Sequence, residues 1–341
     1  MSSIDQIEVL GMFPAIGLLG GVQASGREAW RGIVEKVGTE SSFLFDYQPE
    51  SGKARAVFSA LKNRRRTGTV LIWHLNLLRL VPFLADADRA VVFLHGIEAW
   101  RRMDLLTEWA LRKTDLILSN SKYTWDQFVV HNPAFRSALH SIVHLGAGSE
   151  IEGTVPAPST TPKALMLGRM ARSENYKGHR QMIEAWPQVL SQMPDAELWI
   201  AGDGDLKPEL ENLAVASGLS STIQFCGRVS EAHKQTLIHQ ARCLALPSRG
   251  EGFGLVYLEA MRAGRPCLVS NQDAGREVVD PPDAGLSVDP ADTADIANKL
   301  GRLLTPGNEW ECWSAAARHR YESNFTAKHF QNRLNTALAA V

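Results

Sequence analysis

The feature that most constrains the fold is a regular alternation of short apolar runs with helical patterns along the 341-residue chain. The first half contains six runs typical of strands, at 7–13, 42–47, 69–74, 90–96, 115–120 and 141–146. Helical patterns separate them, at 21–37, 53–66, 76–85, 98–113 and 121–131. Because the runs are almost continuously apolar, they predict strands buried on both faces of a parallel sheet.

The second half repeats the alternation, with strand-like runs at 163–169, 196–204, 222–227, 243–248 and 266–271. Two complete α/β patterns, in a chain too long for one ordinary core, predict two Rossmann-like domains. We expect domains at 1–147 and 163–320, a Pro/Ser/Thr-rich linker at 148–162, and a last helix in 321–341 that packs back on the first domain. Ligands of such sheets bind beyond the carboxyl ends of the strands.

Composition excludes several classes of protein. The formal net charge of -1 argues against a nucleic-acid binder, and no apolar run reaches the roughly 18 residues that would span a bilayer. Asp5 and Glu8 precede any apolar run, so we expect no cleaved signal. Four cysteines without C-x-x-C spacing predict reduced thiols and a cytoplasmic location: Cys226, Cys243, Cys267 and Cys312.

The stretch RGEGFGLVYLEAMRAG at 249–264 carries the clearest site pattern, because it follows a predicted buried strand. Gly252 and Gly254 allow close approach of a ligand to the N-terminus of a helix, which attracts anions. Glu259 lies about five residues into that helix, or about 7.5 Å along its axis. An arbitrary pair such as Glu251 and Glu259 is usually solvated, but here the spacing suits a phosphate at the helix start and a ribose beside its second turn.

The same stretch, extended to GEGFGLVYLEAMRAGRPCLVS, resembles the signature of family 4 glycosyltransferases, which are retaining enzymes. Further segments are similar to family motifs in the same order, at 167–179, 200–214, 225–241 and 276–280. The first half matches less well, but it offers a glycine-rich loop, GLLGGVQ (17–23), and its tract FLHGIEAW (93–100) looks like that of family members that act on bacterial polysaccharides. The resemblance implies the GT-B fold, in which two Rossmann-like domains with parallel sheets face each other across a cleft.

The resemblance also implies a reaction and its participants. A hexose would pass from a UDP- or GDP-sugar to a saccharide or a lipid-linked glycan in polysaccharide or glycoconjugate synthesis. Arg169 and Lys177 would hold the donor diphosphate, although their spacing of eight is wider than is common in the family. Glu251 would bind sugar hydroxyls as a catalytic residue, and Glu259 would accept from the ribose. Further donor contacts are implied for Gly20, Gly21, Arg228, Val229, Phe253, Gly254 and Leu255.

His95 ends a predicted strand of the first half, and by resemblance it would contact the transferred sugar near the reaction centre. A lone histidine after a strand is more often structural, but the HGIE context favours the functional interpretation. Glu98 and Trp100 are weaker candidates for acceptor contact. For His74, which also ends a strand, neither interpretation prevails.

We expect no cofactor and no metal ion, since two cations and a helix N-terminus can stabilise the departing diphosphate. Asp203-Gly204-Asp205 has the letters of a metal motif but matches a structural turn of the family. The acceptor would attack the face that the leaving group vacates, with a diphosphate oxygen taking its proton. Two alternatives stay open: a GT-B nucleotide-sugar epimerase and a non-catalytic nucleotide-sugar-binding protein.

The segment KARAVFSALKNRRR at 53–66 carries six basic residues and no acidic one. Its apolar residues recur at helical spacing, namely Ala54, Val57, Phe58 and Leu61. Either this is a surface helix that packs the apolar stripe inward, or it contacts anionic lipid or a lipid-diphosphate acceptor at the inner face of a membrane.

Overall fold

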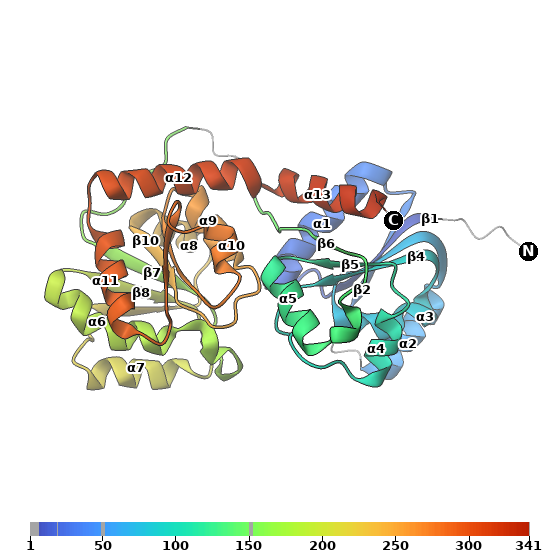
Figure 1. Ribbon diagram of the computed structural model, residues 1–341, viewed down its shortest axis with the longest axis horizontal. Coiled ribbons are helices and arrows are strands. Elements are labelled where there is room, and N and C mark those ends of the chain that lie inside the picture. Colours follow the sequence, from blue (N-terminus) through green and yellow to red (C-terminus); the bar gives the residue numbers. More distant parts are fainter. Residues whose placement is uncertain (1–6, 19, 49–51, 150–152, 341) are drawn as a thin grey trace, which may run out of the picture. The chain divides into compact units, whose positions relative to one another are not determined.

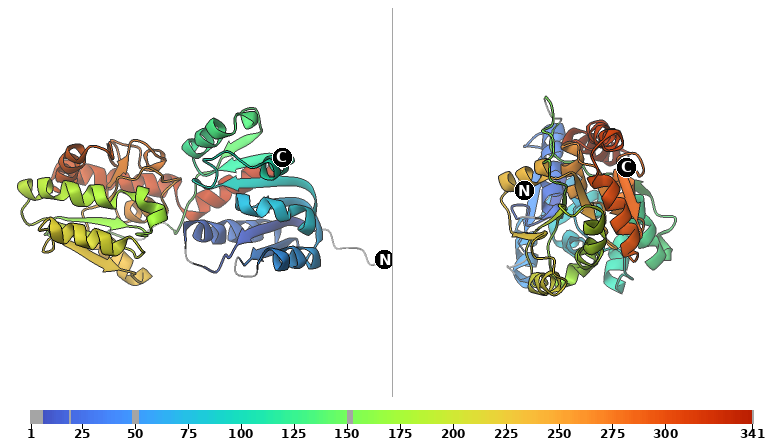
Figure 2. Two further views of the ribbon diagram at one scale, coloured as in Figure 1. Left: turned by 90° about the horizontal axis from the view of Figure 1, so that it is seen from below. Right: turned by 90° about the vertical axis from the view of Figure 1, so that its left-hand side faces the viewer.

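The computed structural model describes residues 7–18, 20–48, 52–149 and 153–340. The chain forms two compact units (Figure 1). The first contains Met1–Ser149 and Phe325–Val341, and the second contains Glu150–Asn324. Figure 2 shows helices on both sides of each sheet.

The first unit is built on a six-stranded parallel sheet of order β2-β1-β3-β4-β5-β6. Its strands are β1 (Ile7–Pro14), β2 (Ser42–Tyr47), β3 (Arg65–Ile72), β4 (Ala85–Leu94), β5 (Leu116–Ser119) and β6 (His140–Ile142). The central strands are apolar on both faces, as shown by Leu71 and Phe93, which are fully buried. The carboxyl ends of β3 and β4 therefore emerge from a dense core, and Trp73 and His95 follow them directly.

Helices of the first unit connect these strands and include the C-terminal helix of the chain. They are α1 (Gly21–Val37), α2 (Lys53–Lys62), the 3-10 helix η2 (Leu75–Leu80), α3 (Val81–Leu84), α4 (Leu105–Leu111), α5 (Lys122–His131), η3 (Pro133–Phe135) and α13 (Ala327–Ala339). Helix α13 packs on α1: Gln331 donates to the carbonyl of Glu28 (3.3 Å), and Asn335 donates to the carbonyl of Gly32 (3.2 Å).

The second unit has its own six-stranded parallel sheet, of order β12-β11-β10-β7-β8-β9. Its strands are β7 (Lys163–Leu167), β8 (Glu197–Ala201), β9 (Ile223–Gly227), β10 (Cys243–Leu246), β11 (Cys267–Ser270) and β12 (Gly285–Val288). Cys243 and Cys267 are buried in neighbouring strands, and all four cysteines are free thiols.

Helices of the second unit flank that sheet. They are the 3-10 helix η4 (Arg172–Lys177), α6 (His179–Gln192), α7 (Lys207–Ala216), α8 (Glu231–Gln240), α9 (Leu255–Arg262), α10 (Gly275–Val279), α11 (Thr293–Leu304) and α12 (Asn308–Asn324). Helix α8 is capped by Ser230, whose hydroxyl accepts from the N–H of His233 (3.2 Å), and α11 is capped by Asp292.

The predicted α/β fold with two Rossmann-like units is confirmed, but three expected helices are wrong in extent. The helix expected at 53–66 ends at Lys62, because Arg65 and Arg66 pair with β4 as the first residues of β3. The helix expected at 98–113 begins only after Asp104, whose carboxylate caps it. The helix expected at 76–85 is split into η2 and α3, and Ala85 already belongs to β4.

Two further differences concern burial and strand count. The apolar stripe expected to pack inward from α2 is exposed at Phe58 (71%) and Leu61 (49%), while Ala56 and Ala60 are buried. The interpretation of α2 as an ordinary surface helix with this stripe inward is therefore wrong. Strand β12 was not predicted, because its residues GLSV include only two apolar side chains and form no continuous apolar run. Within the described ranges, no helix combines the length and the apolar character needed to cross a membrane.

Candidate functional site

Charged side chains gather where β7 and β10 of the second unit end. Lys177, at the end of η4, places its Nζ 3.3 Å from Oε2 of Glu251 in the loop after β10. Glu174 forms ion pairs with Lys177 (3.7 Å) and with Arg169, which follows β7 by two residues. The structure thus brings together three of the residues expected from the sequence, Arg169, Lys177 and Glu251, together with one that was missed, Glu174.

Glycines allow the loop that carries Lys177 to lie against the ends of both strands. A Cβ on Gly168 would lie 3.2 Å from Cδ of Lys177. Gly178, directly after the lysine, has a left-handed conformation (φ 84°), and a Cβ there would lie 2.4 Å from the carbonyl oxygen of Pro247. A side chain at Gly178 would therefore displace the backbone beside Lys177, and one at Gly168 would require a small shift of the lysine side chain.

Helix α9 begins near Glu251, directly after Gly254. This glycine is left-handed (φ 87°), and a Cβ on it would lie 2.4 Å from the ring of Tyr257. No side chain in the described part of the chain caps α9. Phe253 is buried and anchors the loop, whereas Leu255 is half-buried. An uncapped helix N-terminus attracts anions through its N–H groups and its dipole.

Asp273, after β11, holds the loop of Glu251 in place and was missed in the sequence. Its carboxylate accepts from the N–H groups of Glu251 (3.2 Å) and Gly275 (2.9 Å), and the N–H of Ala274 donates back to the carbonyl of Glu251 (3.1 Å). Burial raises the pKa of Asp273 to about 8. The sequence feature that could have identified Asp273 is a lone aspartate between a predicted buried strand and small residues.

Glu259 lies on α9 and pairs with Lys234 of α8, whose Nζ is 2.8 Å from Oε1. Its other oxygen, Oε2, is buried and has no hydrogen-bond partner among the described residues. Burial raises the pKa of Glu259, and Lys234 opposes that shift. Lys234 was also missed in the sequence. Arg228 and Val229 follow β9, where Arg228 is exposed and Val229 is half-buried.

In the first unit, His95 follows β4 and is buried. Its Nε2 lies 2.6 Å from the carbonyl oxygen of Trp73, which can only accept, so Nε2 carries the proton and Nδ1 has the free lone pair. Burial lowers the pKa of His95 to about 4, so the ring is neutral at physiological pH. Glu98 accepts from the N–H of His95 (2.6 Å), and Asn120 donates to the carbonyl of His95 (2.6 Å).

Trp73 connects His95 to the start of α1. Its Nε1 donates to the carbonyl of Val22 (3.0 Å), and its own carbonyl accepts from His95. Gly20 and Gly21 open α1, and no side chain in the described ranges caps this helix. The ring of His74 lies 6.3 Å from that of His95, and its Nδ1 accepts from the N–H of Asn76.

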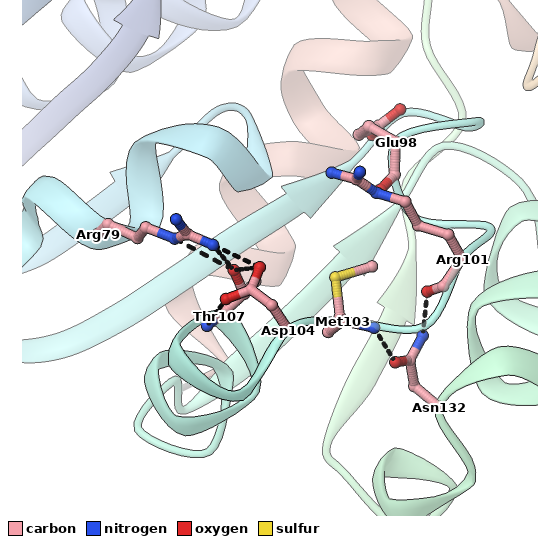
Figure 3. A network of polar contacts seen from close by, with 7 residues as sticks. All are labelled: Arg79, Glu98, Arg101, Met103, Asp104, Thr107 and Asn132. Carbon is pink, nitrogen blue, oxygen red and sulfur yellow. Dashed lines mark hydrogen bonds and ion pairs between the residues drawn. The ribbon is translucent and has the colours of Figure 1, made fainter. Parts of the chain in front are cut away.

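The loop after His95 is held at its far end by a polar network (Figure 3). Asn132 accepts from the N–H of Met103 (2.9 Å) and donates to the carbonyl of Arg101 (2.9 Å). Within this loop, Trp100 packs edge-on against Tyr123 and has a buried Nε1 without a hydrogen-bond partner in the described chain. The candidates Glu98 and Trp100 thus belong to a loop that hydrogen bonds and ring packing hold in place.

The loop of Asp203 and Asp205 lies between β8 and α7. Asp203 accepts from the N–H of Gly204 (3.0 Å), and Asp205 accepts from the N–H of Arg172 (2.8 Å). Gly202 fits there because a Cβ would lie 1.8 Å from the carbonyl oxygen of Gly168. Among the described residues, no group of three His, Cys, Asp or Glu side chains is arranged to hold a metal ion.

Comparison with known proteins finds a family match within the second unit. Residues 161–306 match the family "Glycosyl transferases group 1". The match covers less than half of the chain. The matched residues include Arg169, Lys177, Glu251 and Glu259, and the match supports a glycosyltransferase.

Among relatives of the chain is a GDP-mannose-dependent monoacylated alpha-(1-6)-phosphatidylinositol monomannoside mannosyltransferase of Corynebacterium glutamicum. It is 29% identical over 276 residues, 74% of this chain and 71% of the relative. A phosphatidyl-myo-inositol mannosyltransferase of Mycobacterium leprae is 36% identical over 43% of this chain and 38% of the relative. A glycogen synthase of Mycobacterium tuberculosis is 28% identical, and the chain covers 54% of its length.

Solved structures show the fold. Anabaena HepE in complex with UDP-glucose matches with a TM-score of 0.75 and 17% identity, over 98% of this chain and all of that one. Sucrose-phosphate synthase of Thermosynechococcus elongatus matches with a TM-score of 0.77 and 15% identity, over 98% of both chains. With two parallel six-stranded sheets, the chain has the predicted GT-B fold. That its sheets face each other across a cleft stays a prediction.

Proposed function

We propose that the protein is a retaining family 4 glycosyltransferase that transfers a hexose from a UDP- or GDP-sugar to a saccharide or a lipid-linked glycan. The observation that carries the proposal is the convergence of Lys177, Glu251 and the uncapped start of α9, with Glu259 further along the same helix. The group 1 match over 161–306 supports nucleotide-sugar chemistry at this place.

The buried oxygen Oε2 of Glu259 supports the role proposed for this residue. A buried carboxylate oxygen without a partner costs free energy, and a ribose hydroxyl that donates to it would remove that cost. Lys234 holds the other oxygen and so fixes the direction of the carboxylate. Arg228 and Val229 are our candidates to border the base.

The diphosphate would bind Arg169, Lys177 and the backbone at Phe253, Gly254 and Leu255. Cations and helix N–H groups stabilise the negative charge that develops on the departing diphosphate. We propose on this ground that no metal ion is required. If activity collapses in EDTA and returns with manganese, this part of the proposal is wrong.

Glu251 would bind hydroxyls of the donor sugar, since Lys177 and the backbone contacts of Asp273 hold it beside the start of α9. From the first unit, His95 is our candidate for contact with the transferred sugar, as an acceptor through Nδ1, and Gly20 and Gly21 are our candidates for phosphate contact. The acceptor would attack with retention, and a diphosphate oxygen would take its proton.

Incubation with a panel of nucleotide-sugar donors tests the proposed function. The protein is incubated with UDP- and GDP-sugars, with and without glycan and lipid-linked acceptors. Transfer with retained configuration, or slow donor hydrolysis without acceptor, supports the proposal. An isomerised donor would indicate an epimerase, and a donor that binds but stays unchanged would indicate a non-catalytic protein. The name of the corynebacterial relative makes GDP-mannose and a phosphatidylinositol mannoside the first pair to test.

We also propose that α2 contacts a membrane surface. Phe58 and Leu61 are exposed on a helix with basic neighbours at Arg55, Lys62 and Arg64. Exposed apolar side chains among cations suit the boundary between headgroups and acyl chains of an anionic bilayer.

Vesicle sedimentation tests this contact. Phe58→Ser with Leu61→Ser should abolish binding to vesicles that contain anionic lipid. Val130→Ser, which changes an equally exposed side chain on α5 (69%), should have no effect. Absence of wild-type binding, or equal binding by both variants, would contradict the contact.

A further inference from the structure

The loop that joins Arg169 to Lys177 carries a carboxylate of its own, Glu174. Its side chain is only 11% exposed and forms ion pairs with both cations. Arg169 is 78% exposed, and Glu174 is its ion-pair partner. A carboxylate therefore occupies the contact that the proposed function assigns to a phosphate oxygen.

Glu174 is held there by the surrounding backbone. It lies within η4, where its N–H donates to the carbonyl of Ala171 (2.8 Å). On one side the N–H of Arg172 donates to Asp205 (2.8 Å), and on the other the N–H of Arg249 donates to the carbonyl of Tyr176 (2.9 Å). The loop is thus anchored at both ends, so the carboxylate is presented to the cations by a fixed segment.

The charges of this cluster balance. Arg169 and Lys177 supply two positive charges, and Glu174 and Glu251 supply two negative ones. A cluster without net charge attracts a diphosphate only weakly unless one carboxylate gives way. Glu251 is held through its backbone by Asp273 and through its side chain by Lys177. Arg169 is largely exposed, so its ion pair with Glu174 is the contact that can open.

We propose that Glu174 is a resident counter-ion that competes with the donor diphosphate for Arg169. When a nucleoside diphosphate binds, the guanidinium exchanges the carboxylate for phosphate oxygens, and the reverse exchange favours release of the product. The proposal rests on the function proposed above, and it makes Glu174 a residue that sets affinity for nucleoside diphosphates without touching the transferred sugar.

A structural role would give the opposite result. If Glu174 only orients Arg169 towards the phosphate, its loss would weaken nucleoside diphosphate binding. If it competes, its loss strengthens binding by about fivefold or more, as expected for the removal of one like charge about 4 Å from the anion. The sign of the change therefore separates the two roles.

Calorimetric titration with UDP and with GDP tests the proposal. Glu174→Gln and Glu174→Ala should each bind the preferred nucleotide at least about fivefold more tightly than wild type. Product inhibition should be stronger to the same degree. Glu211→Gln is the matched control, because it removes one carboxylate from an ion pair with Lys207 on α7, outside this cluster, and it should bind like wild type.

A second measurement places the effect on Arg169. In an Arg169→Met background, Glu174→Gln should give a smaller gain, since the guanidinium for which the two anions compete is gone. Unchanged or weaker binding by both Glu174 variants, with folded spectra, would overturn the proposal. If wild type binds neither UDP nor GDP, the proposed function fails instead, and the two failures are thus distinguishable.

Discussion

At the scale of single residues, burial decides how the acidic groups of the site behave. Asp273 is enclosed beneath the loop of Glu251, and burial raises its pKa to about 8 although two N–H groups donate to it. In the unfolded chain its pKa is near the ordinary value of 3.8. The folded state therefore keeps a proton that the unfolded state loses between these two values.

This difference predicts how stability depends on pH. The contribution of Asp273 is fully present below about pH 4 and falls as the pH rises to about 8, by at most about 1.4 kcal/mol per pH unit. Asp273→Asn cannot ionise, so its free energy of unfolding relative to wild type should increase from pH 5 to pH 8 in urea titrations. A difference that stays constant across this range would contradict the assignment.

His95 offers a test at the same scale. Gln can replace the Nε2 donor to the carbonyl of Trp73, whereas Asn can replace the Nδ1 acceptor. We expect His95→Gln to keep more thermal stability and His95→Asn to keep more transferase activity, with both below wild type by about tenfold or more in kcat/KM. Equal activity in the two variants would argue against a sugar contact at Nδ1.

At the scale of elements, left-handed glycines position the helices and loops of the site. Gly254→Ala adds a methyl group 2.4 Å from the ring of Tyr257, in addition to the strain of a positive φ. We expect a loss of about 3 kcal/mol and weaker nucleotide binding, measured by urea unfolding and calorimetry.

Gly218→Ala is the control for this substitution. Its φ is also positive (69°), but a Cβ there would meet no atom within 4 Å. It should cost only about 1 to 2 kcal/mol and leave nucleotide binding unchanged. Similar losses in both variants would show that the contact with Tyr257 does not position α9.

At the scale of the whole molecule, the chain leaves the second unit at Asn324 and ends in the first. Phe330 of α13 is fully buried, and its ring lies 6.2 Å from that of Trp73, beside His95. Gly32 of α1 admits Gln331, since a Cβ there would lie 2.5 Å from its side chain. The last helix is therefore part of the core that supports the candidate site of the first unit.

Phe330→Ala tests this dependence. We expect the variant to lose about 3 to 5 kcal/mol from the first unit, since it removes a buried aromatic ring. Hydrogen exchange should become faster in β1 and β3 and stay unchanged in β7 and β8. Faster exchange in both units would show that they do not unfold independently. Val215→Ala, at an exposed position on α7, should be neutral.

The apolar runs were enough to predict both sheets, because strands buried on two faces are rich in apolar residues. Two elements were not predicted correctly. Strand β12 has only two apolar residues in GLSV, and α4 begins late because Asp104 caps it. In α2, helical spacing identified a stripe at Phe58 and Leu61, but the buried face is that of Ala56 and Ala60.

By itself the sequence determined the alternation of strands and helices, and through GEGFGLVYLEAMRAG it located the main candidate site at the end of one buried strand. Only the tertiary structure decided which charges meet there. Glu174 reaches Arg169, Lys234 reaches Glu259 from 25 residues away, and Asp273 reaches the backbone of Glu251 from 22 residues away. Local patterns are set by the period of one element, whereas the contacts of Lys234 and Asp273 depend on how separate helices and loops pack around the sheet.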